Sequence, residues 1–198
     1  MEQLLEILTF QHLCFAVLVA AIAGIVKGVV GFAMPMVFIT GLSTFLSPEL
    51  ALAGLIVPTL FTNVFQALRQ GPAAAWNSII EFRVFLFFGL LALIVGAQLV
   101  RLLPLQTMLL VIGLPIVLFA LLQLAGVEVK LSGQSFRVAA GVGAFAGFMG
   151  GLSGIWGPPT VVYLAALGTN KNDHMRIQGV IYGLGAVALT FAHLGSGV

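Results

Sequence analysis

The amino-acid sequence predicts an all-α integral membrane protein, a polytopic bundle of helices. Of its 198 residues, 61% are hydrophobic and only 7% are charged, whereas a soluble domain carries about 25% charged residues. The charges fall in clusters, and most of the uncharged gaps are long enough for an α-helix to cross a hydrocarbon core about 30 Å thick. Continuous apolar runs such as FLFFGLLALIVGAQLV (85–100) lack the alternation of transmembrane β-strands, which excludes a β-barrel.

Eight apolar segments account for the expected helices, and polar turns separate most of them. The second and the seventh segments are short, and each begins at a break rich in glycine and proline. The polar turns lie at 46–50, 69–78, 126–137 and 168–176. The apolar pattern places the segments at about 10–30, 33–46, 50–69, 82–100, 104–124, 137–156, 158–168 and 176–196.

The basic residues at the segment ends predict the orientation. If the chain reverses direction at every segment, one side of the membrane receives only Arg101. The other side receives six basic residues, and the positive-inside rule places that side in the cytoplasm. We therefore expect a multi-pass protein of the cell (inner or plasma) membrane, with its N-terminus outside and the loops 69–83, 125–137 and 169–176 in the cytoplasm. The six residues are Arg69, Arg83, Lys130, Arg137, Lys171 and Arg176.

Two stretches of the chain share a pattern at a constant offset of 123 residues. AGIVKGVVGFAMPM (23–36) aligns without a gap with AGFMGGLSGIWGPP (146–159). This predicts two transmembrane repeats, 1–125 and 126–198. Five segments precede the second repeat, so it begins on the opposite side of the membrane, which is an inverted-topology repeat. The identities are Ala23/Ala146, Gly24/Gly147, Gly28/Gly151, Gly31/Gly154 and Pro35/Pro158.

The breaks within the repeats predict two broken or re-entrant hairpins. Gly31 and Gly154 can adopt the backbone angles that a break requires. Pro35, Pro158 and Pro159 suit the first turn of a new helix. Two short helices then begin near the middle of the membrane, and their N-termini carry unpaired N–H groups and partial positive charge. Their convergence favours an anion-binding site, although glycines at four-residue spacing, such as Gly24/Gly28 and Gly147/Gly151, also serve simple helix packing.

Lys27 is the strongest candidate for a functional side chain. An ionisable residue within a membrane segment is costly and usually functional, and a lysine at the break can pair with an anionic substrate. It has two alternative roles: a structural counter-ion or hydrogen-bonding role, and simple extension of the side chain to the membrane surface. Its counterpart in the second repeat is Gly150, so the predicted site is not symmetrical.

Other candidate substrate contacts lie on the third and sixth segments and at the two breaks. Asn63 is the central member of a polar stripe at helical spacing, which lines a pathway or holds a neighbouring helix by hydrogen bonds. Ser153 can donate to an anion or serve packing, and Trp156 can cover the site or pack. The complete predicted substrate-binding set is Lys27, Gly28, Gly31, Asn63, Ser153, Gly154 and Trp156, and the stripe is Thr59, Thr62, Asn63 and Gln66.

Several function classes are disfavoured by the residues that the chain lacks. The single Cys14 and the widely spaced His12, His174 and His193 show no metal-ligand pattern, so no metal or cofactor is expected. No nucleotide-binding or hydrolase motif occurs, which predicts that the chain is not an enzyme. A net charge of +2 is too small and too scattered for nucleic-acid binding. The expected partners are a small anionic solute and the lipid bilayer, and the oligomeric state is left open.

The sequence resembles the TauE/SafE family of sulfite exporters, also called the toluenesulfonate uptake permease family. GIVKGVVGFAMPMV (24–37), followed by SPELALAGLIVPTLFTNVFQALR (47–69), is similar to the first signature of that family. GFMGGLSGIWGPPTVVYLAALG (147–168) is similar to the second. The resemblance implies a two-repeat secondary carrier or permease for sulfite, sulfonates or other organosulfur anions.

One further expectation follows from the repeat, and two alternative functions stay open. Adding 123 to the segments 82–100 and 104–124 places their counterparts near 205–247, beyond Val198, so we expect a second repeat that is incomplete at its C-terminus. An anion channel is the nearest alternative function, because half-helices also build selectivity filters. A membrane scaffold subunit that transports nothing, in which the glycines only pack helices, is the other alternative.

Overall fold

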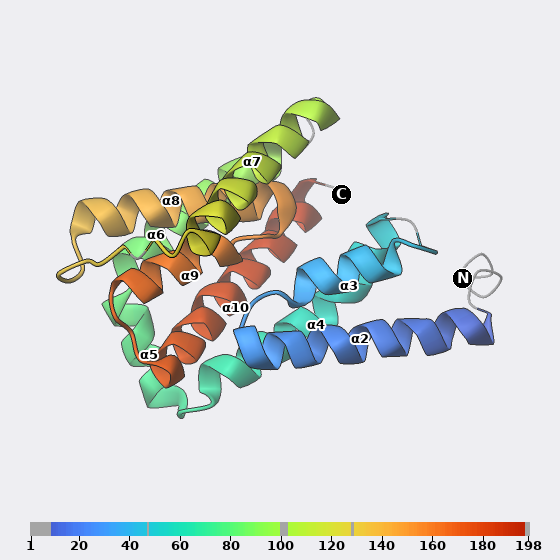
Figure 1. The fold of residues 1–198 in the computed structure, drawn as a ribbon, viewed down its shortest axis with the longest axis horizontal. Helices are drawn as coiled ribbons and strands as arrows, with labels where there is room; N and C mark the ends of the chain where they lie inside the picture. Colours follow the sequence, from blue (N-terminus) through green and yellow to red (C-terminus); the bar gives the residue numbers. More distant parts are fainter. Residues whose placement is uncertain (1–8, 47, 100–102, 128, 197–198) are drawn as a thin grey trace. The chain divides into compact units, whose positions relative to one another are not determined.

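A computed structural model describes residues 9–196 of the chain except residues 47, 100–102 and 128. The described residues form helices joined by short loops and contain no β-strand, which confirms the predicted all-α fold (Figure 1). The helices are α2 (Phe10–Val30), α3 (Met34–Leu42), α4 (Pro48–Leu68), α5 (Pro72–Glu81), α6 (Arg83–Leu99), α7 (Leu105–Leu124), α8 (Phe136–Ser153), α9 (Gly157–Ala166) and α10 (Lys171–Ser196).

Helices α2 and α8 are each long and apolar enough to cross a membrane, with mean hydropathies of 2.5 and 1.2. Helices α5 and α6 pass the same test as a pair, but they are bent by 78° at a short break. These are the candidate spans among the described residues. Together with the apolar composition they identify a polytopic membrane protein, as the sequence predicts.

The chain divides into two compact units, Met1–Phe61 and Thr62–Val198, and each is described by itself. The units are defined by contacts, whereas the predicted repeats 1–125 and 126–198 are defined by equivalent sequence positions. The two divisions therefore need not coincide, and the repeats stay a prediction from the sequence.

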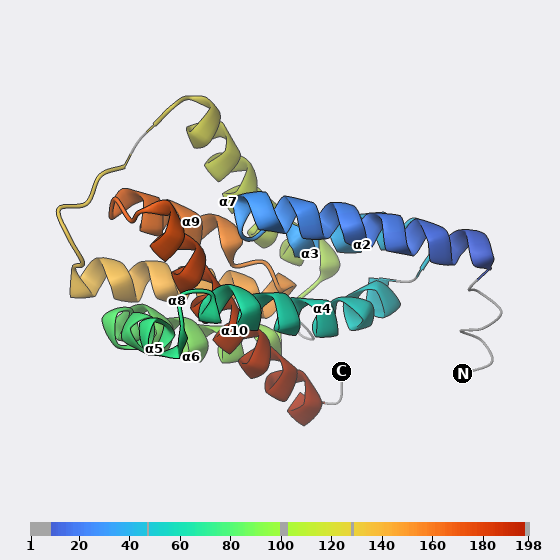
Figure 2. The same cartoon turned by 90° about the horizontal axis from the view of Figure 1, so that it is seen from below.

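The core of the first unit is the hairpin of α2 and α3, which lie side by side in Figures 1 and 2. Gly41 of α3 lies against Val19 of α2 so closely that a Cβ would overlap the valine side chain. Small residues of this kind let membrane helices approach and gain dispersion contacts. The buried residues of this core are Val19, Ala23, Met34, Phe38, Leu42, Ala51 and Leu55.

The second unit is built around α6 and α8, which pack along most of their lengths (Figure 2). Gly143, Gly147 and Gly151 present one face of α8 to the backbone of α6. A Cβ at Gly147 would overlap the carbonyl group of Gly89, and a Cβ at Gly151 that of Leu93. The packing alternative is therefore confirmed for Gly147 and Gly151. Their counterparts Gly24 and Gly28 have no atom within 4 Å of a Cβ position.

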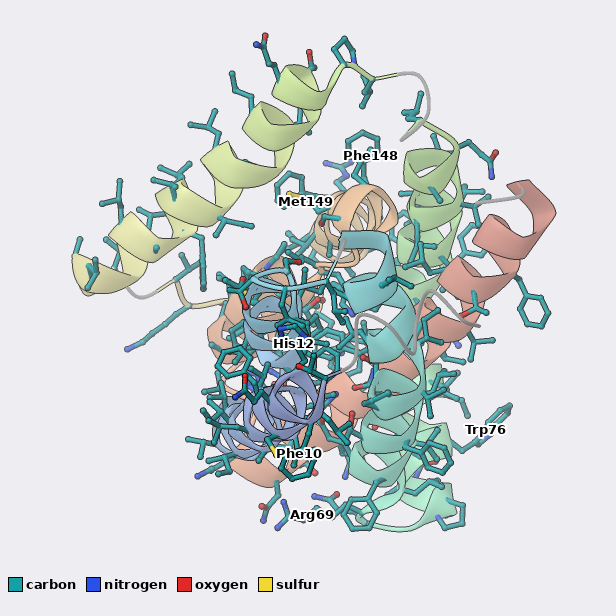
Figure 3. The ribbon with its side chains drawn as sticks, turned by 90° about the vertical axis from the view of Figure 1, so that its right-hand side faces the viewer. Phe10, His12, Arg69, Trp76, Phe148 and Met149 are labelled. Carbon is teal, nitrogen blue, oxygen red and sulfur yellow. The ribbon has the colours of Figure 1, made fainter. Side chains whose placement is uncertain are left out.

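The prediction of a polar turn at 69–78 is wrong, because helix α5 occupies most of this stretch. Pro72 stands in the first turn of α5, where a proline needs no N–H partner, and three alanines follow it. This helix was missed because the segments were chosen by apolarity rather than by helix propensity. Trp76 is 62% exposed and points away from the helices (Figure 3), as an anchor at the membrane interface does.

The predicted turn at 168–176 is also shorter than expected, since α10 already begins at Lys171. The Asn170 side-chain oxygen accepts a 3.0 Å hydrogen bond from the Asp173 N–H, which is the usual cap of a helix N-terminus. Asp173 also lies in the first turn, where a negative charge is favourable. A polar sequence thus forms the start of a helix.

The turns that carry the predicted cytoplasmic charges meet at one end of the second unit. Arg176 donates through Nε to Ser78 Oγ at 2.9 Å and through Nη1 to Gln70. The Leu131 N–H donates to the Ala166 carbonyl at 2.7 Å. The loops before α5, α8 and α10 therefore share one end of the second unit, and the orientation of the chain in the membrane stays a prediction. Arg101, the single basic residue expected on the other side, lies outside the described residues.

Candidate functional site

The two predicted hairpins break with the same local backbone geometry. Helix α2 ends at Gly31 with φ 92° and ψ −13°, and α8 ends at Gly154 with φ 69° and ψ 6°. In each case the glycine N–H donates 2.7 Å to a carbonyl four residues earlier, that of Lys27 or of Gly150. A proline then stands in the first turn of the following helix. Both breaks are therefore left-handed glycine caps followed by a new short helix.

The left-handed angles at Gly154 give a first testable prediction. Gly154→Ala should lower the free energy of unfolding by about 1–2 kcal/mol, because an alanine in this backbone region brings its Cβ too close to the following carbonyl. No atom lies within 4 Å of a Cβ there, so the loss comes from strain alone. Thermal unfolding in detergent measures it. Gly141→Ala in α8, also with open space around it, is the control and should be neutral or slightly stabilising.

Lys27 lies on the inner face of the first hairpin. The buried residues of α2 are Val19, Ala23 and Lys27, which at four-residue spacing form one row facing α3. The Lys27 side chain is only 5% exposed, so it does not extend to the surface. The alternative in which Lys27 simply reaches the membrane surface is therefore disfavoured, and a cation is held one turn before the break.

Trp156 occupies the tip of the second hairpin. Its indole lies directly over Gly150 of α8, where a Cβ would overlap ring atom Cε3. On another side it approaches Gly185 of α10, where a Cβ would lie 3.2 Å from Cζ2. The residue is 8% exposed. Two glycines therefore make the space for this indole, which packs between α8 and α10.

A small cavity lies beside Trp156 in the second unit. Its volume is about 20 Å³, which is room for one water molecule. Its walls come from α6, α8, α9 and α10, and Thr160 is the one hydroxyl residue among them. The Thr160 hydroxyl already donates to the Trp156 carbonyl at 2.8 Å. This cavity is too small for a sulfur oxyanion in the conformation described.

Ser153 is used by the backbone of its own break. Its hydroxyl donates to the Met149 carbonyl at 2.7 Å and accepts from the Ile155 N–H at 3.1 Å. A serine has a single O–H proton, so Ser153 has none left for an anion in this conformation. These two hydrogen bonds hold the backbone of the break, and a contact between Ser153 and an anion stays a prediction.

The two short helices differ in the donors that they offer. A helix N-terminus normally presents the N–H groups of its first residues, but a proline has none. Helix α3 has one proline in its first three residues, Pro35, whereas α9 has two, Pro158 and Pro159. The N-termini of the two short helices are therefore not equal as the prediction assumed. The N-terminus of α3 offers more backbone N–H donors than that of α9.

Polar side chains of α4 and α10 meet inside the second unit. Gln66 donates through Nε2 to the Met175 carbonyl at 2.8 Å and to Gln178 Oε1 at 3.4 Å. Gln178 is fully buried, and its Nε2 has no partner among the described residues. Asn63, 1% exposed, lies on the same side, near Gly183 of α10. For Gln66, the helix-holding alternative is the one observed.

Gln178 was not among the predicted site residues, although a lone amide in an apolar helix is a usable signal. A buried amide N–H without a partner costs about 1–3 kcal/mol, so such a group usually has a reason to be kept. We therefore add Gln178 to the candidate donors for a ligand.

The Gln66 contacts give a second prediction. Gln66→Leu should destabilise the second unit by about 1–3 kcal/mol, because the amide of Gln178 then loses its partner inside the protein. Changing both residues to leucine should cost less than the sum of the two single changes, since no orphaned amide remains. Thermal unfolding of the unchanged protein, the two single variants and the double variant measures this double-mutant cycle. Gln98→Leu on α6, which is exposed, should change stability by less than about 0.5 kcal/mol.

Within each unit, the predicted substrate-binding residues near the break lie close together. Lys27 and Gly31 lie one turn apart at the first break, and Gly28 between them is exposed. Ser153, Gly154 and Trp156 form the second break. Among the described residues, no three His, Cys, Asp or Glu side chains come together as a metal site requires. The side chain of His193 lies outside that description.

Comparison with known proteins identifies the family. The profile of the sulfite exporter TauE/SafE family matches residues 16–198, which include both breaks and the polar stripe of α4. Searches of curated proteins and of solved structures each found no match. The matched range covers nearly the whole chain. The protein therefore belongs to the TauE/SafE family of sulfite exporters and is a membrane transport protein.

Proposed function

We propose that this protein is a secondary carrier that moves small sulfur-containing anions, sulfite or organic sulfonates, across the cell membrane. The observation that carries the proposal is the buried Lys27, held one turn before the break of an apolar hairpin. An ionisable side chain buried within an apolar membrane hairpin is costly and usually functional. The family of the chain makes a sulfur oxyanion the natural partner.

The chemistry of the first break suits such a ligand. Sulfite and sulfonates present three oxygens, each of which accepts hydrogen bonds. The Lys27 ammonium supplies up to three donors, and the N-terminus of α3 adds backbone donors and partial positive charge. Gly28 and Gly31 carry no side chain that would block an approach to the backbone here.

The second unit has candidate donors of its own. Asn63 and Gln178 are buried amides that can donate to an anion as it crosses the membrane. Trp156 and Gly154 form the second tip, and Ser153 supports that tip through the backbone. We propose that residues 1–125 and 126–198 are the two halves of an inverted repeat, with the N-terminus outside and the basic end of the second unit in the cytoplasm.

Reconstitution into liposomes tests the proposed function. Vesicles that contain the full chain should take up radiolabelled sulfite faster than empty vesicles, at a rate that saturates with concentration. Unlabelled sulfite, taurine, sulfoacetate and sulfate, added in turn as competitors, rank the substrates. A current that rises linearly with concentration and voltage would instead indicate a channel. No movement of any of these anions would support the scaffold alternative.

A further inference from the structure

Large and small residues are exchanged between the two hairpins at equivalent positions. The position one turn before the glycine cap is Lys27 in the first hairpin and Gly150 in the second. The residue directly before the short helix is Ala33 in the first hairpin and Trp156 in the second. Each hairpin thus contains one long side chain and one minimal residue, but in opposite places.

The second hairpin shows why the two positions depend on each other. The Trp156 ring lies where any side chain at position 150 would begin. A glycine is therefore required at 150 as long as a tryptophan stands at 156. Trp156 therefore determines whether position 150, in the last turn before the Gly154 cap, can carry a side chain.

The first hairpin has the complementary arrangement. Ala33 precedes α3 as Trp156 precedes α9, and its side chain is a single methyl group. Lys27 is buried and lies on the face of α2 that packs toward α3. The position of Lys27 is thus equivalent to position 150, over which the indole lies in the second hairpin.

We propose that Trp156 is the apolar counterpart of Lys27 and closes the second tip, so that each chain binds one anion, at the Lys27 tip. This inference rests on the proposed function. Two other features agree with it: Pro159 stands where the first hairpin has Met36 and removes one backbone donor, and the Ser153 proton is already used within the second tip.

An exchange of residues tests whether the side chain allowed at position 150 depends on the size of the residue at position 156, which we call the size dependence. Gly150→Lys alone should lower Tm by at least about 5 °C or prevent folding, because its side chain and the indole compete for one space. Combining Gly150→Lys with Trp156→Ala should recover at least half of that loss. Gly141→Lys, on the same helix in an open position, is the control and should change Tm little. A double variant that is no more stable than Gly150→Lys alone would overturn the size dependence.

Isothermal titration calorimetry with sulfite tests whether the second tip of the unchanged protein is closed to anions. The expected stoichiometry is one anion per chain, and the double variant, with a lysine at each tip, should bind two. Two anions per unchanged chain would overturn the inference. If the unchanged protein binds no sulfite while the double variant still recovers its Tm, the proposed function fails and the size dependence stands.

Discussion

Gly147→Leu is expected to prevent assembly of the second unit. The backbone of α6 passes directly over Gly147, and even a Cβ there would overlap the carbonyl group of Gly89. Because the obstacle is backbone rather than a flexible side chain, neither helix can yield without giving up contacts along its whole length. The expected loss is at least about 3 kcal/mol of unfolding free energy, at the upper end of overpacking costs. Size-exclusion chromatography and thermal unfolding in detergent measure it.

Gly141→Leu is the matched control for this prediction. Gly141 lies on the same helix, two turns earlier, and it is exposed with no atom within 4 Å of a Cβ. A leucine at 141 should leave both the elution profile and Tm close to those of the unchanged protein. Equal behaviour of the two variants would show that α6 and α8 do not pack through their glycines.

Lys27→Met is expected to weaken sulfite binding by roughly 10- to 100-fold. Methionine keeps a long apolar side chain but removes the charge, and a hydrogen bond to a charged group contributes about 1.5–3 kcal/mol, where every 1.4 kcal/mol corresponds to tenfold. Lys27→Arg keeps the charge and should bind better than Lys27→Met. Titration calorimetry with sulfite measures the dissociation constant of each protein.

Two controls separate binding from folding in this experiment. Lys171→Met removes an exposed lysine at the start of α10 and should leave the affinity unchanged. Tm of Lys27→Met is measured beside the affinity, so that a loss of folding is not read as a loss of binding. Unchanged sulfite affinity in Lys27→Met would remove Lys27 from the binding site.

The strongest sequence signals were those with a direct physical cause. Glycine followed by proline marks a place where a helix must end and another can begin, and both breaks occur at Gly31 and Gly154 as predicted. Apolarity located the membrane helices, but it could not find α5, whose residues are helix-forming rather than apolar. The N-terminal turn of α10 was hidden for the same reason, since Asn170 and Asp173 are polar residues that cap a helix.

The candidate site was less predictable because it depends on neighbours distant in sequence. Lys27 stands out by its charge alone. Whether a glycine serves helix packing depends on which helix lies against it. Gly147 and Gly151 face α6, whereas Gly24 and Gly28 have no neighbouring helix at the Cβ position within the first unit. The dependence between Gly150 and Trp156 requires the position of an indole ring, which no spacing rule provides.

The most direct test of the central claim is exchange of sulfite across a vesicle membrane. Liposomes that contain the protein are loaded with radiolabelled sulfite, and efflux is followed with and without unlabelled sulfite outside. A carrier whose anion site alternates between the two sides predicts efflux that is several-fold faster in the presence of external sulfite. Efflux that is unaffected by external sulfite, or equal to that of empty vesicles, would contradict the account.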